Sequence, residues 1–155
     1  MSDFEFLSPD DKPALLAVNS ADLKAQAEAI LMGLGYKVHS IATHDEFLSK
    51  FQQANYEILI IELPFAGSTG VQDNETLKTI QGMSMNARRH CTVFLIGEPF
   101  QSLHPMEAFQ QSVHAVVNPN ELADFESILQ KVIGENELFL KAFKDVQMQM
   151  AKGEL

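Results

Sequence analysis

The sequence predicts a single α/β domain built on a parallel sheet. Short apolar runs alternate with longer segments in which apolar residues recur every three or four positions. The run at 57–63 (EILIIEL) is apolar on both faces except near its end, as in a central strand covered by helices on both sides. The chain has 155 residues, 46% hydrophobic and 21% charged, which is typical of one globular domain.

The first strand and helix show how the boundaries can be recognised. The run ALLAV at 14–18 is bounded by a proline and by polar residues, so it is predicted to be a buried strand. Asn19 or Ser20 can cap the following helix, expected over 21–34, and Gly35 stands where a left-handed C-terminal cap belongs.

The remaining elements follow from the same signals. The strands are short apolar runs, and the helices have an apolar face; a threonine can cap the second helix and a proline opens the short one. In chain order we expect a strand at 36–41, a helix at 44–53, a strand at 57–63, a helix from about 74, a strand at 91–96, a helix at 105–111, a strand at 115–117 and a helix from 121 to about 152.

This order favours one topology. Five strands with intervening helices imply right-handed crossovers, and they suggest a flavodoxin-like three-layer sandwich with strand order 2-1-3-4-5. Sheets of this kind place their sites at the carboxyl ends of the strands. We divide the chain into a flexible arm at 1–11, the domain at 12–134 and a helical extension at 135–155.

Composition narrows the classes of function. The net charge of −10 argues against nucleic-acid binding, which needs a basic surface. The single Cys91 excludes an intramolecular disulfide and a cysteine-rich zinc site. No apolar run approaches the ~20 residues of a membrane span, and the acidic N-terminus differs from a signal peptide, so we expect no membrane contact and a cytoplasmic location.

Cofactor and metal signatures are also missing from the sequence. The turn after the first strand, NSADLKA, has no glycine that would let backbone amides approach a phosphate. The five histidines are scattered, without the spacing that brings metal ligands together. We therefore expect no cofactor and no bound metal.

Four segments, KPALLAVNSAD, YEILIIELPF, TVFLIGE and HAVVNPNEL, resemble the receiver domain of bacterial response regulators. The resemblance covers about 12–133. ARRHCTVFLIGE and SVHAVVNPNELADF are also similar to the receiver-like module that ends some bacterial zinc-ribbon proteins, which would make this chain a C-terminal module. The resemblance implies the receiver fold and a role in signal transduction.

The positions that would carry phosphotransfer in a receiver have changed. Receivers place an acidic pair after strand 1 for Mg²⁺, the phosphoacceptor aspartate at the end of strand 3, a hydroxyl after strand 4, and a lysine before a proline after strand 5. Here these positions hold Asn19 and Ser20, Glu62, Gly97, and Asn118 before Pro119, in that order. Without the acidic pair Mg²⁺ binding is not expected, and without the lysine nothing pairs an acyl phosphate.

Two interpretations of Glu62 remain open. Its charge could mimic a phosphorylated aspartate and hold one conformation, although Gly97 and Asn118 offer neither a hydroxyl nor a cation to grip it. Alternatively, Glu62 is a polar residue solvated at a strand end. In both cases the sequence predicts a pseudo-receiver, not an enzyme.

The last helix is longer than a receiver needs. Apolar positions continue past 133 at spacings of three and four, which is the a and d pattern of a coiled coil. Asn136 falls on an a position, where it could fix register, but Gly134 could instead end one helix and Asn136 begin another. The extension would then either fold back on its own domain or pair with a second copy or a partner.

We therefore expect a phosphorylation-independent module that binds protein partners, with itself as one candidate partner in a homodimer. Alternatives are a small-molecule or anion sensor in the strand-end crevice, an active phospho-receiver, and a small flavodoxin-like enzyme. The expected partner surfaces comprise the last strand–helix face, Met106, Phe109, Leu122 and Phe125, and the extension, Phe139, Phe143, Val146 and Met150.

Overall fold

The computed structural model describes residues 7–8, 10–68, 70–88 and 90–153, and it gives no side-chain description for 85 and 86. Most of the arm expected at 1–11 therefore lies outside the described residues. The elements are β1 (Pro13–Ala17), α1 (Ala21–Gly33), β2 (Lys37–Ile41), α2 (His44–Gln53), β3 (Ile58–Glu62), α3 (Glu75–Gly82), α4 (Met85–Arg88), β4 (Thr92–Ile96), α5 (Pro105–Gln111), β5 (Ala115–Val117), the 3₁₀ segment η1 (Pro119–Asp124) and α6 (Phe125–Ala151).

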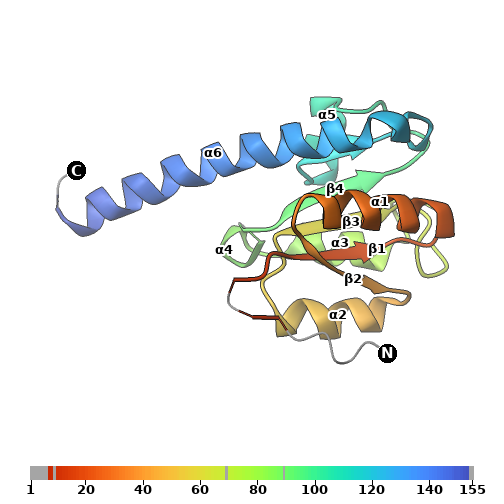
Figure 1. The fold of residues 1–155 in the computed structure, drawn as a ribbon, viewed down its shortest axis with the longest axis horizontal. Helices are drawn as coiled ribbons and strands as arrows, with labels where there is room; N and C mark the ends of the chain where they lie inside the picture. Colours follow the sequence, from red (N-terminus) through yellow and green to blue (C-terminus); the bar gives the residue numbers. More distant parts are fainter. Residues whose placement is uncertain (1–6, 9, 69, 89, 154–155) are drawn as a thin grey trace.

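The sheet has the predicted topology. Its five strands are all parallel, in the order β2-β1-β3-β4-β5 (Figure 1). β1, β3 and β4 are buried on both faces apart from the last residue of β3, which explains their nearly unbroken apolar sequences.

Two apolar layers hold the sandwich together. Alternate strand residues face α2, α3 and α5 on one side, where Phe47, Leu77 and Ala108 are buried. The other residues of the strands face α1 and the first half of α6, where Leu31 and Phe125 are completely buried. The core therefore involves α6 only as far as about Ile133, the last α6 residue packed against it.

Helix caps lie where the sequence placed them. The Ser20 hydroxyl accepts from the Leu23 amide at the start of α1, and Thr43 forms a capping box with Glu46. Gly35 has φ +94°, the left-handed conformation expected after α1. These local signals fix where the helices enter and leave the sheet.

The last helix differs from the prediction in two respects. The segment expected to be helical from 121 begins as η1, and the backbone leaves helical geometry at Glu121 before α6 starts at Phe125. Gly134 does not divide the helix: α6 runs without a break for 27 residues, so Asn136 caps no separate helix. The short α4 was not predicted.

The second half of α6 projects from the domain, and the C-terminus lies at its far end (Figure 1). Beyond Leu140 every described residue of this helix is exposed except Phe143, which is half-buried. Of the alternatives that the sequence leaves open, this arrangement does not fit an extension folded back over its own domain. No helix of the described segments is both long and apolar enough to span a membrane.

Candidate functional site

The sheet brings the five altered positions to its carboxyl edge. Asn19 and Ser20 follow β1, Glu62 is the last residue of β3, Gly97 follows β4 and Asn118 follows β5. This placement is the one that the resemblance to a receiver implies. Each residue has its own hydrogen bonds and packing.

Glu62 binds the backbone of the neighbouring loop. Its Oε1 accepts a hydrogen bond of 2.7 Å from the Asn19 amide and one of 2.8 Å from the Ser20 amide. Ser20 is the N-cap of α1, so the carboxylate also lies at the positive end of a helix. Glu62 is therefore held by specific donors, and describing it only as solvated is wrong.

A second contact fixes the end of β3. The completely buried Asn74 donates from Nδ2 to the carbonyls of Glu62, at 3.2 Å, and Leu63, at 2.9 Å. Its Oδ1 accepts from the Leu77 amide and so caps α3. The sequence indicated only a helix start near 74, because nothing in the pattern shows that a cap also ties two elements together.

A side chain at Gly97, where a receiver carries a hydroxyl, would be tightly packed. A Cβ atom at this position would lie 3.0 Å from Leu63 Cδ2 and 3.0 Å from Phe100 Cε2. Gly97 itself is buried and bonded on both sides: its amide donates to the Val117 carbonyl, and its own carbonyl accepts from the Phe100 amide. The aromatic ring of Phe100 closes this part of the site.

Asn118 ties loops together. Its Nδ2 donates to the carbonyls of Phe100, at 2.8 Å, and Glu98, at 3.2 Å, while its Oδ1 accepts from the Asn120 amide. Its own amide donates to the Ser102 hydroxyl. Pro119 then begins η1. The side chain at the lysine position therefore holds the loop after β4.

The carboxylate ligands of a Mg²⁺ site are not gathered here. Glu62 is the one acid among the five positions, and its Oε1 already accepts two amides. Within the described segments no group of three or more His, Cys, Asp or Glu side chains could hold a metal ion.

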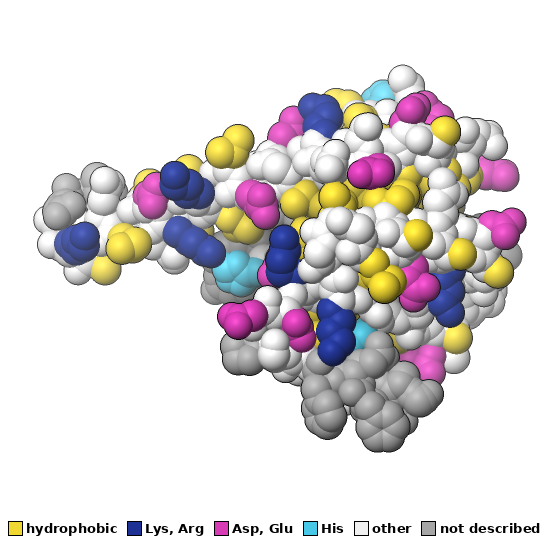
Figure 2. Space-filling model, in the orientation of Figure 1, with side chains coloured by type: hydrophobic (Ala, Val, Ile, Leu, Met, Phe, Trp, Pro, Cys, Tyr) yellow, Lys and Arg dark blue, Asp and Glu magenta, His cyan; other side chains and the backbone are white. Residues whose placement is uncertain are grey.

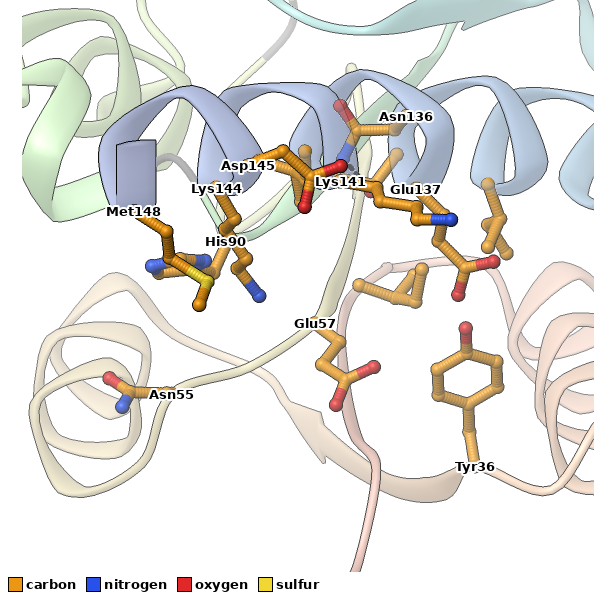
Figure 3. A pocket seen from close by; sticks show the side chains of 14 residues that line it. Tyr36, Asn55, Glu57, His90, Asn136, Glu137, Lys141, Lys144, Asp145 and Met148 are labelled. Carbon is orange, nitrogen blue, oxygen red and sulfur yellow. Dashed lines mark hydrogen bonds between the residues drawn. The ribbon is translucent and has the colours of Figure 1, made fainter. Parts of the chain in front are cut away.

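Two cavities lie on either side of α6. Both are near the amino ends of the strands, away from the carboxyl edge described above. The first, of about 640 Å³, is lined by polar residues of α6 and by residues that precede β3 and β4. Figure 3 shows Glu137 and Lys141 of α6 above Tyr36 and Glu57. Burial, with Glu57 and then Glu137 adding to it, raises the pKa of the Tyr36 phenol to about 12.

The second cavity, of about 760 Å³, is more aromatic. Phe139 and Phe143 of α6 form one wall, and Phe109 of α5, which is 78% exposed, lies on another. Arg88 and His114 also line it. We call this space, between α6 and the α4–α5 region, the aromatic groove.

The charged residues of the aromatic groove have structural partners. Arg88 donates to the carbonyls of Ile80, near the C-terminal end of α3, and Ser112, and a cation is favoured at that end of a helix. His114 Nδ1 accepts from the Val93 amide at 2.9 Å. Burial, and secondarily the charge of Arg88, lowers the pKa of His114 to about 4. Arg89 lies outside the described residues.

Five of the eight residues predicted for the partner surface are exposed. Phe125 is completely buried between the sheet and α1, because it begins α6 on the core side, so its assignment to a partner surface is wrong. Leu122 and Phe143 are half-buried. The exposed members are Met106, Phe109, Phe139, Val146 and Met150.

No protein-family model matches the sequence, and the search of curated proteins finds no match. Solved structures match over most of the chain. The chemotaxis response regulator CheY4 of Vibrio cholerae is 19% identical with a TM-score of 0.62, and the match covers 79% of this chain and 98% of that one. The receiver domain of sensor histidine kinase PA1611 from Pseudomonas aeruginosa, with a magnesium ion in its active-site cleft, is 20% identical with a TM-score of 0.57, covering 80% of this chain and 98% of that one.

A third match extends along α6. A fusion that contains the trimeric coiled coil of yeast Spc42 is 19% identical with a TM-score of 0.62, and covers 96% of this chain and 94% of that one. Identities at this level show a shared fold. From the sheet order, the two helical layers and these matches, the chain has the fold of the CheY-like response-regulator receiver domains, with a long C-terminal helix added to it.

Proposed function

We propose that this chain is a signal-transduction module that works without phosphorylation and binds protein partners, including itself, in the bacterial cytoplasm. The observation that carries the proposal is the pair of hydrogen bonds from the Asn19 and Ser20 amides to Glu62. In a receiver the acidic pair at these two positions holds Mg²⁺ next to the phosphoacceptor. Here the Glu62 carboxylate, at the acceptor position, accepts hydrogen bonds directly from the backbone amides of this loop.

The neighbouring positions support the same proposal. A phosphorylated receiver needs a hydroxyl and a lysine that move toward the phosphoryl group. Gly97 has no hydroxyl and is packed against Phe100, while the Asn118 amide group is engaged with loop carbonyls. The switch elements are thus connected by fixed contacts. We infer that the module presents one constant surface to its partners.

The proposed interaction surface is the projecting half of α6 with the adjoining α5. Leu138, Phe139 and Met150 are each more than 60% exposed, and Phe109 of α5 faces the same groove as Phe139. Exposed large apolar side chains gathered in this way are typical of protein–protein contact sites. In Figure 2 hydrophobic, Lys and acidic side chains are interspersed along the projecting helix.

Titration with Mg²⁺ and beryllofluoride, a mimic of the phosphoryl group, tests the phosphorylation-independent part of the proposal. Isothermal calorimetry on the full chain should show no binding heat up to 10 mM Mg²⁺ (about ten times the ~1 mM Kd at the weak end of Ca²⁺ sites). The PA1611 receiver domain, whose structure contains magnesium, serves as the positive control. Saturable binding of beryllofluoride by the wild-type chain would contradict the proposal.

A matched variant shows whether the altered residues are the cause. Asn19→Asp, Ser20→Asp and Glu62→Asp together place three carboxylates at the ends of β1 and β3, which are the oxygen ligands that Mg²⁺ prefers. We expect this triple variant to bind Mg²⁺ while the wild-type chain does not. If neither binds, the loop geometry and not the residue types excludes the metal.

A further inference from the structure

We propose that the projecting halves of α6 from two copies of this chain pair antiparallel, with each helix tip lying in the aromatic groove of the other copy. The inference rests on the proposed function and deepens it, because it names the partner and its orientation on the same surface. Three observations carry it: the layers along α6, the position of the groove, and the distribution of charge.

The first observation concerns the apolar stripe. Asn136 donates from Nδ2 to the Thr92 hydroxyl of its own domain at 2.8 Å, so the stripe open to a partner begins at Phe139. The stripe continues with Phe143, which is half-buried against its own chain, and with the exposed Val146 and Met150. Two large side chains, Phe139 and Phe143, are thus followed by two smaller ones. A parallel pair would stack each residue on its own copy, which puts Phe against Phe in two successive layers.

An antiparallel pair matches these volumes better. With the two-fold axis between residues 144 and 145, Phe139 meets Met150 of the partner subunit and Phe143 meets the partner's Val146. Large and small side chains then alternate across the interface, as close packing requires. The Phe139 layer also brings a thioether against an aromatic ring, which is a favourable contact.

The second observation concerns the aromatic groove. Phe139 and Phe143, the first two residues of the stripe, form one wall of this groove. The groove has a volume of about 760 Å³ and is open to solvent. In an antiparallel pair the free tip of the partner helix reaches this groove and can fill it against Phe109. In a parallel pair the part of the partner helix that lies beside the groove is the part attached to the partner's own domain. The free tip of the partner helix is then too far away to enter the groove.

The third observation concerns charge. Residues 136–153 contain three lysines and two acids, so the acidic excess behind the net charge of −10 lies in the rest of the chain. Parallel pairing would place two strongly acidic domains side by side, whereas antiparallel pairing places them at opposite ends of the helix pair. The positions that flank the stripe carry no charge, so they cause no electrostatic repulsion in either orientation. They are Leu140, Ala142, Gln147 and Gln149.

Substitutions at two adjacent positions of α6, about 100° apart around the helix, test the pairing. Phe139 and Leu138 are adjacent, apolar and 64% and 71% exposed, but only Phe139 belongs to the stripe. By sedimentation equilibrium the wild-type chain and Leu138→Glu should show twice the monomer mass, and Phe139→Glu should weaken the dimer at least 100-fold. A monomeric wild-type chain, a trimer, or equal loss of the dimer in both variants would overturn the proposal.

Disulfide trapping tests the orientation. Ala142 and Gln149 of opposite copies come to nearly the same level only in the antiparallel pair; in a parallel pair they are about 10 Å apart along the axis. Mixed Ala142→Cys and Gln149→Cys chains should give a cross-linked heterodimer, whereas Met150→Cys alone should give none. The buried native Cys91, whose pKa is raised to about 12 by burial, makes the wild-type chain an unreactive control.

The opposite pattern, with Met150→Cys cross-linked to itself and no mixed heterodimer, would establish a parallel pair and overturn the proposal. The magnesium and beryllofluoride titration does not involve α6, so failure of the pairing and failure of phosphorylation independence are separable.

Discussion

At the scale of single residues, two polar side chains at the carboxyl edge of the sheet hydrogen-bond to the backbone of neighbouring loops. Glu62 binds two amides of the β1–α1 loop, and Asn118 binds two carbonyls of the loop after β4. Both side chains therefore hold loops in place. A group that fixes a loop should show its effect first in the free energy of unfolding.

Removing the Glu62 carboxylate should cost stability. Charge-assisted hydrogen bonds contribute about 1.5–3 kcal/mol each, but these two are exposed to solvent, so we expect Glu62→Ala to lose only about 1 kcal/mol. Glu62→Gln keeps an acceptor oxygen and should lose less. Urea unfolding of both variants measures the difference. An alanine variant as stable as the wild-type chain would mean that water replaces the carboxylate without loss.

Restoring a hydroxyl at Gly97 should be harmful. A Cβ atom there would lie 3.0 Å from both Leu63 and Phe100, and overpacking of this kind costs about 1–3 kcal/mol. Gly82→Ser is the matched control, because a Cβ at Gly82 meets no atom within 4 Å. Thermal unfolding should separate the two variants. If Gly97→Ser is as stable as the control, the Phe100 ring moves freely and the site is not closed.

The hydrogen bond from the Val93 amide requires an unprotonated Nδ1 on His114, whose pKa is lowered from 6.5 to about 4. The unfolded chain takes up this proton near pH 6.5 and the folded chain only near pH 4. Stability should therefore fall as the pH is lowered from about 6.5 to about 4. His114→Asn keeps an acceptor and should flatten this part of the profile. A His114 ring that titrates near pH 6.5 by NMR would contradict the prediction.

At the scale of elements, the two halves of the continuous helix α6 lie in different surroundings. Its first half packs in the core, and its second half projects from the domain. Between them Asn136 hydrogen-bonds Thr92 at the start of β4, so the last contact with the sheet is polar. Gly134 lies at this junction, and its backbone is helical.

Gly134→Ala distinguishes a continuous helix from a broken one. A Cβ at Gly134 meets no atom within 4 Å, and alanine in a helix interior is favoured over glycine by roughly 0.5–1 kcal/mol. We expect the variant to be more stable and slightly more helical by circular dichroism. Destabilisation would show that Gly134 adopts a left-handed conformation in solution, as a helix end would require.

The elements themselves were largely predictable from sequence. α2, α5 and β5 begin and end where the pattern placed them, because each has a clear cap, proline or bounded apolar run. The kink at Glu121 and the short α4 were missed, since neither interrupts the apolar periodicity in a recognisable way. Gly134 was ambiguous because glycine ends some helices and is tolerated in others.

The candidate site was predictable in position but not in its contacts. The fold alone brings Asn19, Glu62 and Gly97 to one edge. The bonds from Glu62 to backbone amides depend on its rotamer and on the loop path, and the closure of Gly97 by Phe100 depends on packing across elements. Phe125 was misassigned because a helix stripe does not say which of its residues faces the core.

At the scale of the whole molecule, the charge of the chain opposes its self-association. Each copy carries −10, and all of this negative excess lies outside residues 136–153, which contain three lysines and two acids. In the proposed pair the attraction between copies is apolar, from the stripe and the aromatic groove, whereas the repulsion is electrostatic and acts over a Debye length of about 8 Å at physiological salt. The two contributions therefore respond differently to ionic strength.

Salt should strengthen the dimer. Raising NaCl from 0.05 to 0.5 M (illustrative concentrations that shorten the Debye length from about 14 to about 4 Å) screens the repulsion between the acidic domains and leaves apolar burial intact. Because the antiparallel arrangement already separates the domains, we expect only a modest gain, about three- to tenfold in Kd, by sedimentation equilibrium. A much larger gain would indicate that the domains lie side by side. Weakening by salt would mean instead that ion pairs hold the copies together, which the uncharged flanks of the stripe do not predict.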